Sequence, residues 1–163
     1  MTTPIRLQYD FDVPARVLYT LDSDPEFDRA VIKAGGMQPE SLMEKKVPHG
    51  RVEEVRISHS LAVPGFLKKL AHTFTGWVEV RDWNHTEMYY AWRVKTDVPG
   101  VRIRIAGKTS IIARGDVHCT RLVEGTFDIG VPLLGPRIAR FAIAQTQEAN
   151  DKRADALRKR LGL

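Results

Sequence analysis

The last third of the chain constrains the fold most, because two long strand-like runs lead directly into one uninterrupted helical segment. Gly135 suits the N-cap of this helix, and Pro136 suits its first position, where the missing N–H costs nothing. No other glycine or proline occurs before Gly162, so the pattern predicts one helix that ends at Leu161. About 26 residues at a rise of 1.5 Å make a rod of roughly 40 Å, long enough to cross a whole sheet. Such a helix either packs flat on the sheet or encloses a cavity.

Alternating apolar and polar residues predict the strands. Residues 5–11 have the two-residue period of a strand with one buried face, and residues 15–21 and 25–34 are expected to form two short helices. Gly107 and Gly125 lie inside strand-like runs, where we expect bulges or bends that curl the sheet. Six further strands are expected at residues 41–47, 52–61, 75–83, 87–96, 101–114 and 117–131. This order predicts an α+β fold with helices on one face of an antiparallel sheet.

Composition indicates one domain, residues 1–163, with an ordinary surface. The 25 Lys and Arg residues are interspersed with 20 Asp and Glu residues and form no aromatic-interleaved basic motif, so we expect no nucleic-acid partner. The chain has no secretory apolar segment and no run of 18 apolar residues, and its single cysteine, Cys119, suits a reducing compartment. We therefore expect a cytoplasmic protein. The oligomeric state does not follow from the sequence.

Two short motifs carry a resemblance to a known superfamily. Residues 125–131 (Gly-Thr-Phe-Asp-Ile-Gly-Val) lead through residues 132–135 (Pro-Leu-Leu-Gly) into the terminal helix, and residues 64–67 (Pro-Gly-Phe-Leu) precede the middle strands. Nearly the whole chain resembles the START-like (SRPBCC, helix-grip) superfamily, which includes the birch-pollen allergen, lipid-transfer domains and bacterial polyketide cyclases. It looks closest to an uncharacterised bacterial branch of that superfamily.

The resemblance implies a curved seven-stranded antiparallel sheet around a long C-terminal helix, with two short helices after the first strand. It also implies a hydrophobic cavity between the sheet and the helix. It implies no single function, because the fold hosts carriers, enzymes and co-regulators.

The inward face of the predicted terminal helix favours a cavity over close packing. Small residues such as Ala142 and Ala149 recur at seven-residue spacing on this face, and small side chains opposite a concave sheet leave volume unfilled. Gln145, Asn150 and Arg153 share this side and would fit poorly in a dry contact. Close helix-to-sheet packing is the alternative.

Aromatic and apolar residues on the predicted strands, together with the helix, supply candidate walls for an apolar ligand. The candidate ligand-binding residues are Tyr9, Phe11, Met88, Tyr90, Trp92, Phe127, Ile129, Phe141, Ala142, Gln145 and Ala149. A short amphipathic segment beside a glycine hinge is a candidate lid, with Phe66, Leu67 and Leu70 on its apolar face. The same segment, through its lysines, is a candidate for transient membrane contact, although so short a helix binds weakly alone.

One run leaves open which face of the sheet is buried. Trp77, Glu79, Arg81 and Trp83 alternate onto one face. If this face points inward, Glu79 and Arg81 form a buried ion pair. A solvent-facing ladder is the favoured interpretation, because burial of charge is costly.

The leading functional hypothesis is non-catalytic binding or transport of a hydrophobic small molecule, such as a lipid, a fatty acyl group or a polyketide-like compound. The five histidines and one cysteine show no metal-ligand spacing, so neither a metal nor a cofactor is predicted. One alternative is a polyketide cyclase or dehydratase-like enzyme in which His59, Tyr90 or Glu79 moves protons. The other is a protein-binding co-regulator that uses the basic surface.

Overall fold

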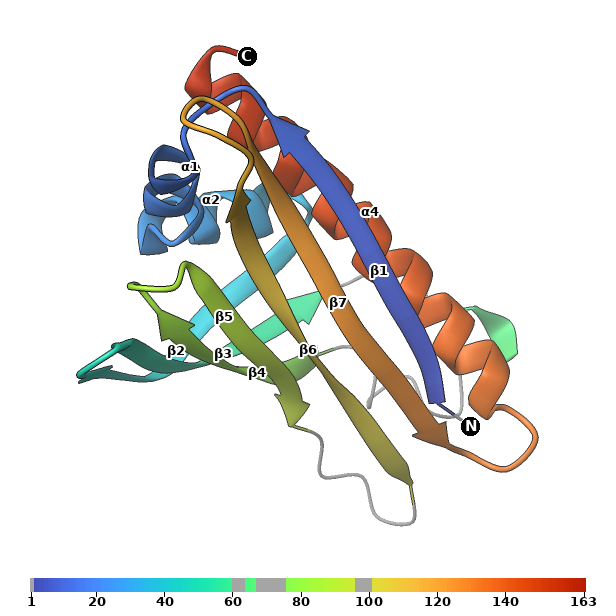
Figure 1. Ribbon diagram of the computed structural model, residues 1–163. Coiled ribbons are helices and arrows are strands. Elements are labelled where there is room, and N and C mark those ends of the chain that lie inside the picture. The colour runs from blue at the N-terminus through green and yellow to red at the C-terminus, as the bar shows by residue number, and fades with distance from the viewer. Residues whose placement is uncertain (1, 60–63, 67–75, 96–100) are drawn as a thin grey trace.

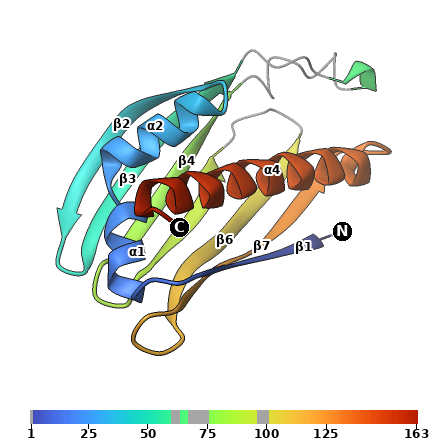
Figure 2. The same cartoon turned by 90° about the horizontal axis from the view of Figure 1, so that it is seen from above.

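The computed structural model describes residues 2–59, 64–66, 76–95 and 101–163. Within these residues, seven strands form one antiparallel sheet in the order β1-β7-β6-β5-β4-β3-β2, and the sheet curves around a long helix (Figures 1 and 2). The strands are β1 Thr2–Phe11, β2 Met37–Val47, β3 Gly50–His59, β4 Gly76–Asn84, β5 Tyr89–Lys95, β6 Arg102–Ala113 and β7 Cys119–Gly130. The helices are α1 Ala15–Asp22, α2 Pro25–Ala34 and α4 Gly135–Leu161. The predicted helix-grip arrangement is confirmed.

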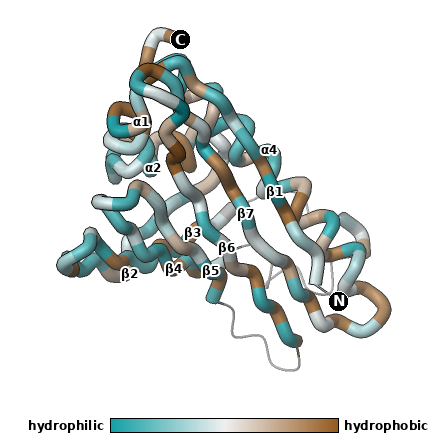
Figure 3. The backbone as a smooth tube through the Cα atoms, in the orientation of Figure 1, coloured by the Kyte–Doolittle hydropathy of each residue, from teal (hydrophilic) through white to brown (hydrophobic). Residues whose placement is uncertain are grey.

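The first and last strands of the chain lie side by side. β1 pairs with β7 along its full length, from Thr2 opposite Asp128 to Phe11 opposite Cys119. Hydrophobic and hydrophilic positions alternate along both strands (Figure 3), and the buried positions of β1 include Ile5 and Phe11. The two-residue period therefore places one face of each strand against the core, as the sequence predicts.

The paired glycines of β6 and β7 make room for a tryptophan. Gly107 and Gly125 face each other in an unbroken register, so the expected bulges do not occur there. A Cβ atom added to Gly125 would lie 2.7 Å from the Trp92 ring, closer than side-chain atoms normally approach. The register shift that the sheet does show lies in edge strand β2, between Ser41 and Met43. An irregular edge is a poor template for pairing with another chain.

α1 and α2 form a compact corner at one end of the sheet. The Asp24 side chain caps α2 by accepting a hydrogen bond from the Glu26 N–H, and α2 ends before Gly36, whose φ of +83° suits glycine. Beneath the corner lies a core cluster that includes Phe11, Leu18, Tyr19, Phe27, Trp83 and Leu157. The corner is thereby fixed to both the sheet and the far end of α4.

α4 packs tightly at its two ends but not in its middle. The helix begins at Gly135, one residue earlier than predicted, because the Gly135 N–H already donates a 2.8 Å hydrogen bond to the Val131 carbonyl. Its buried residues fall into two groups, Gly135, Ile138 and Ala139 near its start and Arg153, Ala154 and Leu157 near its end. Every residue of α4 from 140 to 152 is half-buried or exposed. No described helix is both long enough and apolar enough to cross a membrane.

The run of alternating residues in β4 faces inward, so the favoured solvent-facing interpretation is wrong. Arg81 is only 5% exposed and Trp83 only 1% exposed. The inward position is stable because each polar group has a partner: the Arg81 Nη1 lies 2.7 Å from Asp28, and the Trp83 indole N–H donates to Glu53 at 2.9 Å.

Candidate functional site

A cavity of about 580 Å³ lies between the middle of α4 and the sheet, where the helix leaves the sheet surface uncovered. The wall draws residues from β2 to β7, from α2 and from α4. Ala149 and Glu148 line it and are also exposed to solvent, which places its mouth beside the middle of α4. The volume is ordinary for a site that encloses a small organic molecule.

Most of the candidate ligand-binding residues come together around this cavity. Tyr90 and Trp92 reach it from β5, and Phe127 and Ile129 reach it from β7. The four candidates on α4 also line it, namely Phe141, Ala142, Gln145 and Ala149.

Tyr9, Phe11 and Met88 do not line the cavity. Phe11 is part of the core cluster beneath α1, and Tyr9 and Met88 pack against that cluster. The Tyr9 hydroxyl donates a 2.6 Å hydrogen bond to Asp151 on α4. Tyr9 and Phe11 lie toward the end of the sheet where α1 and α4 fill the space, and Met88 lies in the turn before β5 and not in the strand predicted from residue 87.

The candidate lid is described only in part. The Phe66 ring lies beneath the Arg137 guanidinium, 4.2 Å from its carbon to the ring centre, and packs against the cluster at the start of α4. Leu67 and Leu70 lie outside the described residues, as does the side chain of His59. The lid therefore stays a sequence-based prediction.

The cavity wall changes from apolar to charged along α4. Near the start of the helix the wall is formed by Phe141, Phe127 and Ile129. Toward its end the wall includes Arg121 and Arg153, two buried arginines. A molecule with an apolar body and one polar end matches this gradient.

Asp22, at the end of α1, holds the two arginines together. Its carboxylate accepts from the Arg121 Nε at 3.0 Å and from the Arg153 Nε at 2.6 Å. Burial alone raises the pKa of Asp22, but the charges and hydrogen bonds of the two arginines outweigh burial, and the pKa lies below its ordinary value. The Asp22 carboxylate therefore stays ionised although it is fully buried.

Asp28, on α2, extends the same cluster to the sheet. It accepts from the Arg153 Nη1 and from the Arg81 Nη1, both at 2.7 Å. Burial again opposes ionisation, and the positive charges of Arg81 and Arg153 hold the pKa of Asp28 well below its usual range. Arg81 continues the chain of contacts by donating from Nε to Glu79 at 2.9 Å.

Uncharged polar side chains also line the inner end of the cavity. The Arg121 Nη1 donates to the Asn150 side chain at 2.8 Å, and its Nη2 lies 3.4 Å from the Tyr90 hydroxyl oxygen. The Thr109 hydroxyl accepts from the Trp92 indole N–H at 3.1 Å. These contacts fix the side chains that a ligand would meet.

Sequence reasoning noticed Arg153 on the inward helix face but missed Asp22, Asp28 and Arg121. A signal existed for Arg121, because it alternates with the inward-facing Cys119 and Val123 on β7. A charged residue at an inward strand position requires a buried partner. Nothing in the sequence identifies that partner, since Asp22 lies 99 positions away from Arg121.

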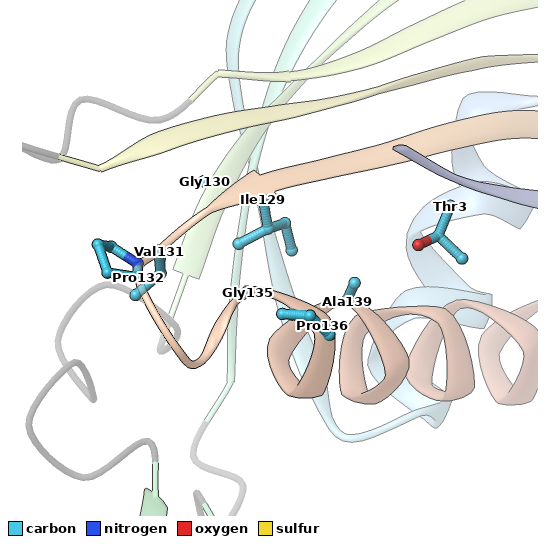
Figure 4. Close-up of a pocket in the computed structure, with 8 residues that line it drawn as sticks. All are labelled: Thr3, Ile129, Gly130, Val131, Pro132, Gly135, Pro136 and Ala139. Atoms are coloured by element: carbon cyan, nitrogen blue, oxygen red, sulfur yellow. The ribbon is translucent and has the colours of Figure 1, made fainter. Parts of the chain in front are cut away.

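A second, smaller pocket lies at the start of α4. It has about 380 Å³ and is bounded by the end of β7, the following loop and the first turns of the helix, with Thr3 of β1 on its far side (Figure 4). Ile129 borders both pockets. Apart from Thr3, its eight lining residues are apolar residues and glycines, and none of them has a charged side chain.

The described residues contain no cluster of three or more metal-binding side chains. The Cys119 thiol is buried, and burial raises its pKa to about 11, so at neutral pH it is an unreactive thiol.

Several solved structures have a fold similar to that of this chain. Zhui, an aromatase/cyclase from Streptomyces sp. R1128, superposes with a TM-score of 0.71 at 12% identity, over 96% of this chain and 92% of that chain. A norcoclaurine synthase from Thalictrum flavum, in complex with dopamine and hydroxybenzaldehyde, gives 0.64 at 13% identity, over 99% and 87%. A START superfamily protein from Mycobacterium smegmatis gives 0.64 at 14% identity, over 97% and 98%. At these identities the likeness establishes the fold, which is START-like, as the resemblance implied.

Residues 6–161 match the family described as "Protein of unknown function (DUF2505)", and the chain belongs to that family. No curated protein sequence matches the chain.

Proposed function

We propose that the protein binds an apolar small molecule, of lipid, fatty acyl or polyketide-like character, in the cavity between α4 and the sheet without converting it. The observation that carries this proposal is the separation of α4 from the sheet between its two packed ends, which leaves about 580 Å³ lined largely by apolar and aromatic side chains. Apolar surface removed from water contributes about 25 cal/mol per Å². A ligand that buries roughly 300 Å² of such surface therefore gains about 7.5 kcal/mol before the costs of association.

The comparisons support a cavity that accepts aromatic or polyketide-like molecules. One similar structure is that of an aromatase/cyclase, and another holds dopamine and hydroxybenzaldehyde. The aromatic side chains Trp92, Phe127 and Phe141 offer this chain a comparable surface for a flat apolar ligand.

Tryptophan fluorescence tests the proposal directly, because Trp77 and Trp92 line the cavity. Titration with dodecanol or 2-acetylnaphthalene is expected to change the emission saturably. Ala142→Phe, which places a ring inside the cavity, is expected to weaken binding at least tenfold while the protein stays folded. Ala144→Phe is the matched control, because Ala144 is exposed on the same helix and does not line the cavity. Equal affinity in both variants would contradict binding at this site.

One observation favours catalysis as the second candidate. The Tyr90 hydroxyl lies beside the Arg121 guanidinium at the inner end of the cavity, where it could donate a proton to a carbonyl oxygen of a polyketide-like substrate. Mass analysis after long incubation with 2-acetylnaphthalene and with longer polyketone mimics separates the two functions. Unchanged ligand supports the carrier, whereas a product that Tyr90→Phe abolishes supports the enzyme.

A further inference from the structure

The charges at the inner end of the cavity cancel. Four arginines and four carboxylates lie in one network of ion pairs, with separations from 2.6 to 3.6 Å. The arginines are Arg51, Arg81, Arg121 and Arg153, and the carboxylates are Asp22, Asp28, Glu53 and Glu79. The network therefore carries no net charge.

This balance leaves no cation in the network for a ligand carboxylate. Arg121 pairs with Asp22, and Arg153 pairs with both Asp22 and Asp28. The two arginines line the cavity, whereas the two carboxylates lie behind its wall. At the mouth, Lys152 is also matched, by Glu148 at 2.9 Å. An ionised carboxylate that enters such a site loses its hydration without gaining an unmatched partner, so it binds at a disadvantage.

The wall offers hydrogen-bond donors to a neutral oxygen instead. An Arg121 N–H approaches the Tyr90 oxygen, so the hydroxyl accepts there and its own O–H can donate to a ligand. The Thr109 oxygen likewise accepts from Trp92, so its own O–H can donate. Both side chains line the cavity at the charged end.

We propose that the ligand is a neutral molecule, with an apolar body and a carbonyl or hydroxyl oxygen at its inner end, and that the balanced charge network selects it against carboxylates. This inference rests on the proposed binding function. Glu79 is the member of the network that sets the balance at the wall, because it is the network carboxylate that lines the cavity.

Matched probes that differ only in the polar group test the inference. The pairs are dodecanol with dodecanoate and 2-acetylnaphthalene with 2-naphthoate, titrated at about pH 8, where both acids are ionised. The neutral member of each pair is expected to bind about tenfold or more tightly. If the carboxylates bind equally well or better, the inference is wrong while the proposed function stands. If no probe of either kind binds, the proposed function fails and the inference fails with it.

Glu79→Gln tests the cause of the selection. The amide oxygen can still accept from Arg81, but the network gains one net positive charge. The preference for the neutral probe is expected to fall about tenfold, because the carboxylate now meets an unmatched cation. Glu124→Gln is the control, since Glu124 pairs with Arg6 on the exposed face of the sheet and does not line the cavity. An unchanged preference in folded Glu79→Gln protein would show that charge balance does not select the ligand.

Discussion

Neutralising Asp22 is expected to be one of the most damaging single changes in this protein. Asp22 is 1% exposed and bridges two buried arginines. In the Asp22→Asn variant, Arg153 keeps Asp28, but Arg121 loses the one carboxylate that it contacts among the described residues. Arg121 is fully buried, and an uncompensated buried charge costs about 3–5 kcal/mol. For a domain of this size that loss lowers Tm by roughly 6–20 °C.

Urea denaturation followed by circular dichroism measures the free energy of unfolding for this test. Asp116→Asn is the control, because Asp116 is exposed in the turn between β6 and β7, and its loss should change stability by less than about 0.5 kcal/mol. A free energy of unfolding for Asp22→Asn within about 1 kcal/mol of the natural protein would refute the argument that Asp22 compensates Arg121.

The ion pairs of Asp22 and Asp28 also determine how the stability of the protein changes in acid. The pKa values of Asp22 and Asp28 are lower in the folded protein than their ordinary values. Below pH about 3.9 the unfolded chain therefore binds more protons at these groups than the folded protein does. The stabilisation is complete above that pH and is lost as the pH falls toward the folded pKa values. Asp22→Asn should unfold in acid with a shallower dependence of stability on pH than the natural protein.

Two further changes test packing and backbone geometry. Gly125→Ala places a methyl group against the Trp92 ring and the Ala106 carbonyl, and we expect the free energy of unfolding, measured by urea denaturation, to fall by about 1–3 kcal/mol. Gly65→Ala is the control and should show no measurable loss, because a Cβ at Gly65 meets nothing within 4 Å. Leu133→Gly should raise the free energy of unfolding by up to about 1 kcal/mol, because Leu133 is 97% exposed and holds a φ of +65° that is unfavourable for a leucine; a loss of stability would show that the side chain contributes contacts.

The elements that the sequence predicts well are those whose limits are set locally. α2 begins with Pro25 after the capping Asp24 and ends before two glycines, so both of its ends can be recognised from neighbouring residues. α4 ends at Leu161, before Gly162, whose φ of +72° suits glycine, and its inward residues follow the helical period. The helical period therefore predicts which residues of α4 face the sheet, and the candidates on α4 line the cavity.

The charged end of the cavity depends on contacts that no local pattern encodes. Arg153 meets Asp22 across 131 positions and Asp28 across 125 positions of sequence. Alternation in β4 shows that Trp77, Arg81 and Trp83 share a face. It cannot show that carboxylates from α2 and β3 pair with Arg81 on that face. Likewise, the cavity ends before Tyr9 because α1 and α4 fill that part of the sheet, which is a property of packing and not of strand period.

The pairing of β1 with β7 has a consequence for the order in which the molecule assembles. Arg6 and Glu124 face each other across the two strands, although 118 positions separate them in the chain. During synthesis β1 emerges early and has no partner strand until nearly the whole domain has left the ribosome. Such distant pairing slows folding, because a long loop must close before the contact forms. The cavity itself needs α4, the last element of the fold, so we expect it to be complete only when α4 closes over the sheet late in folding.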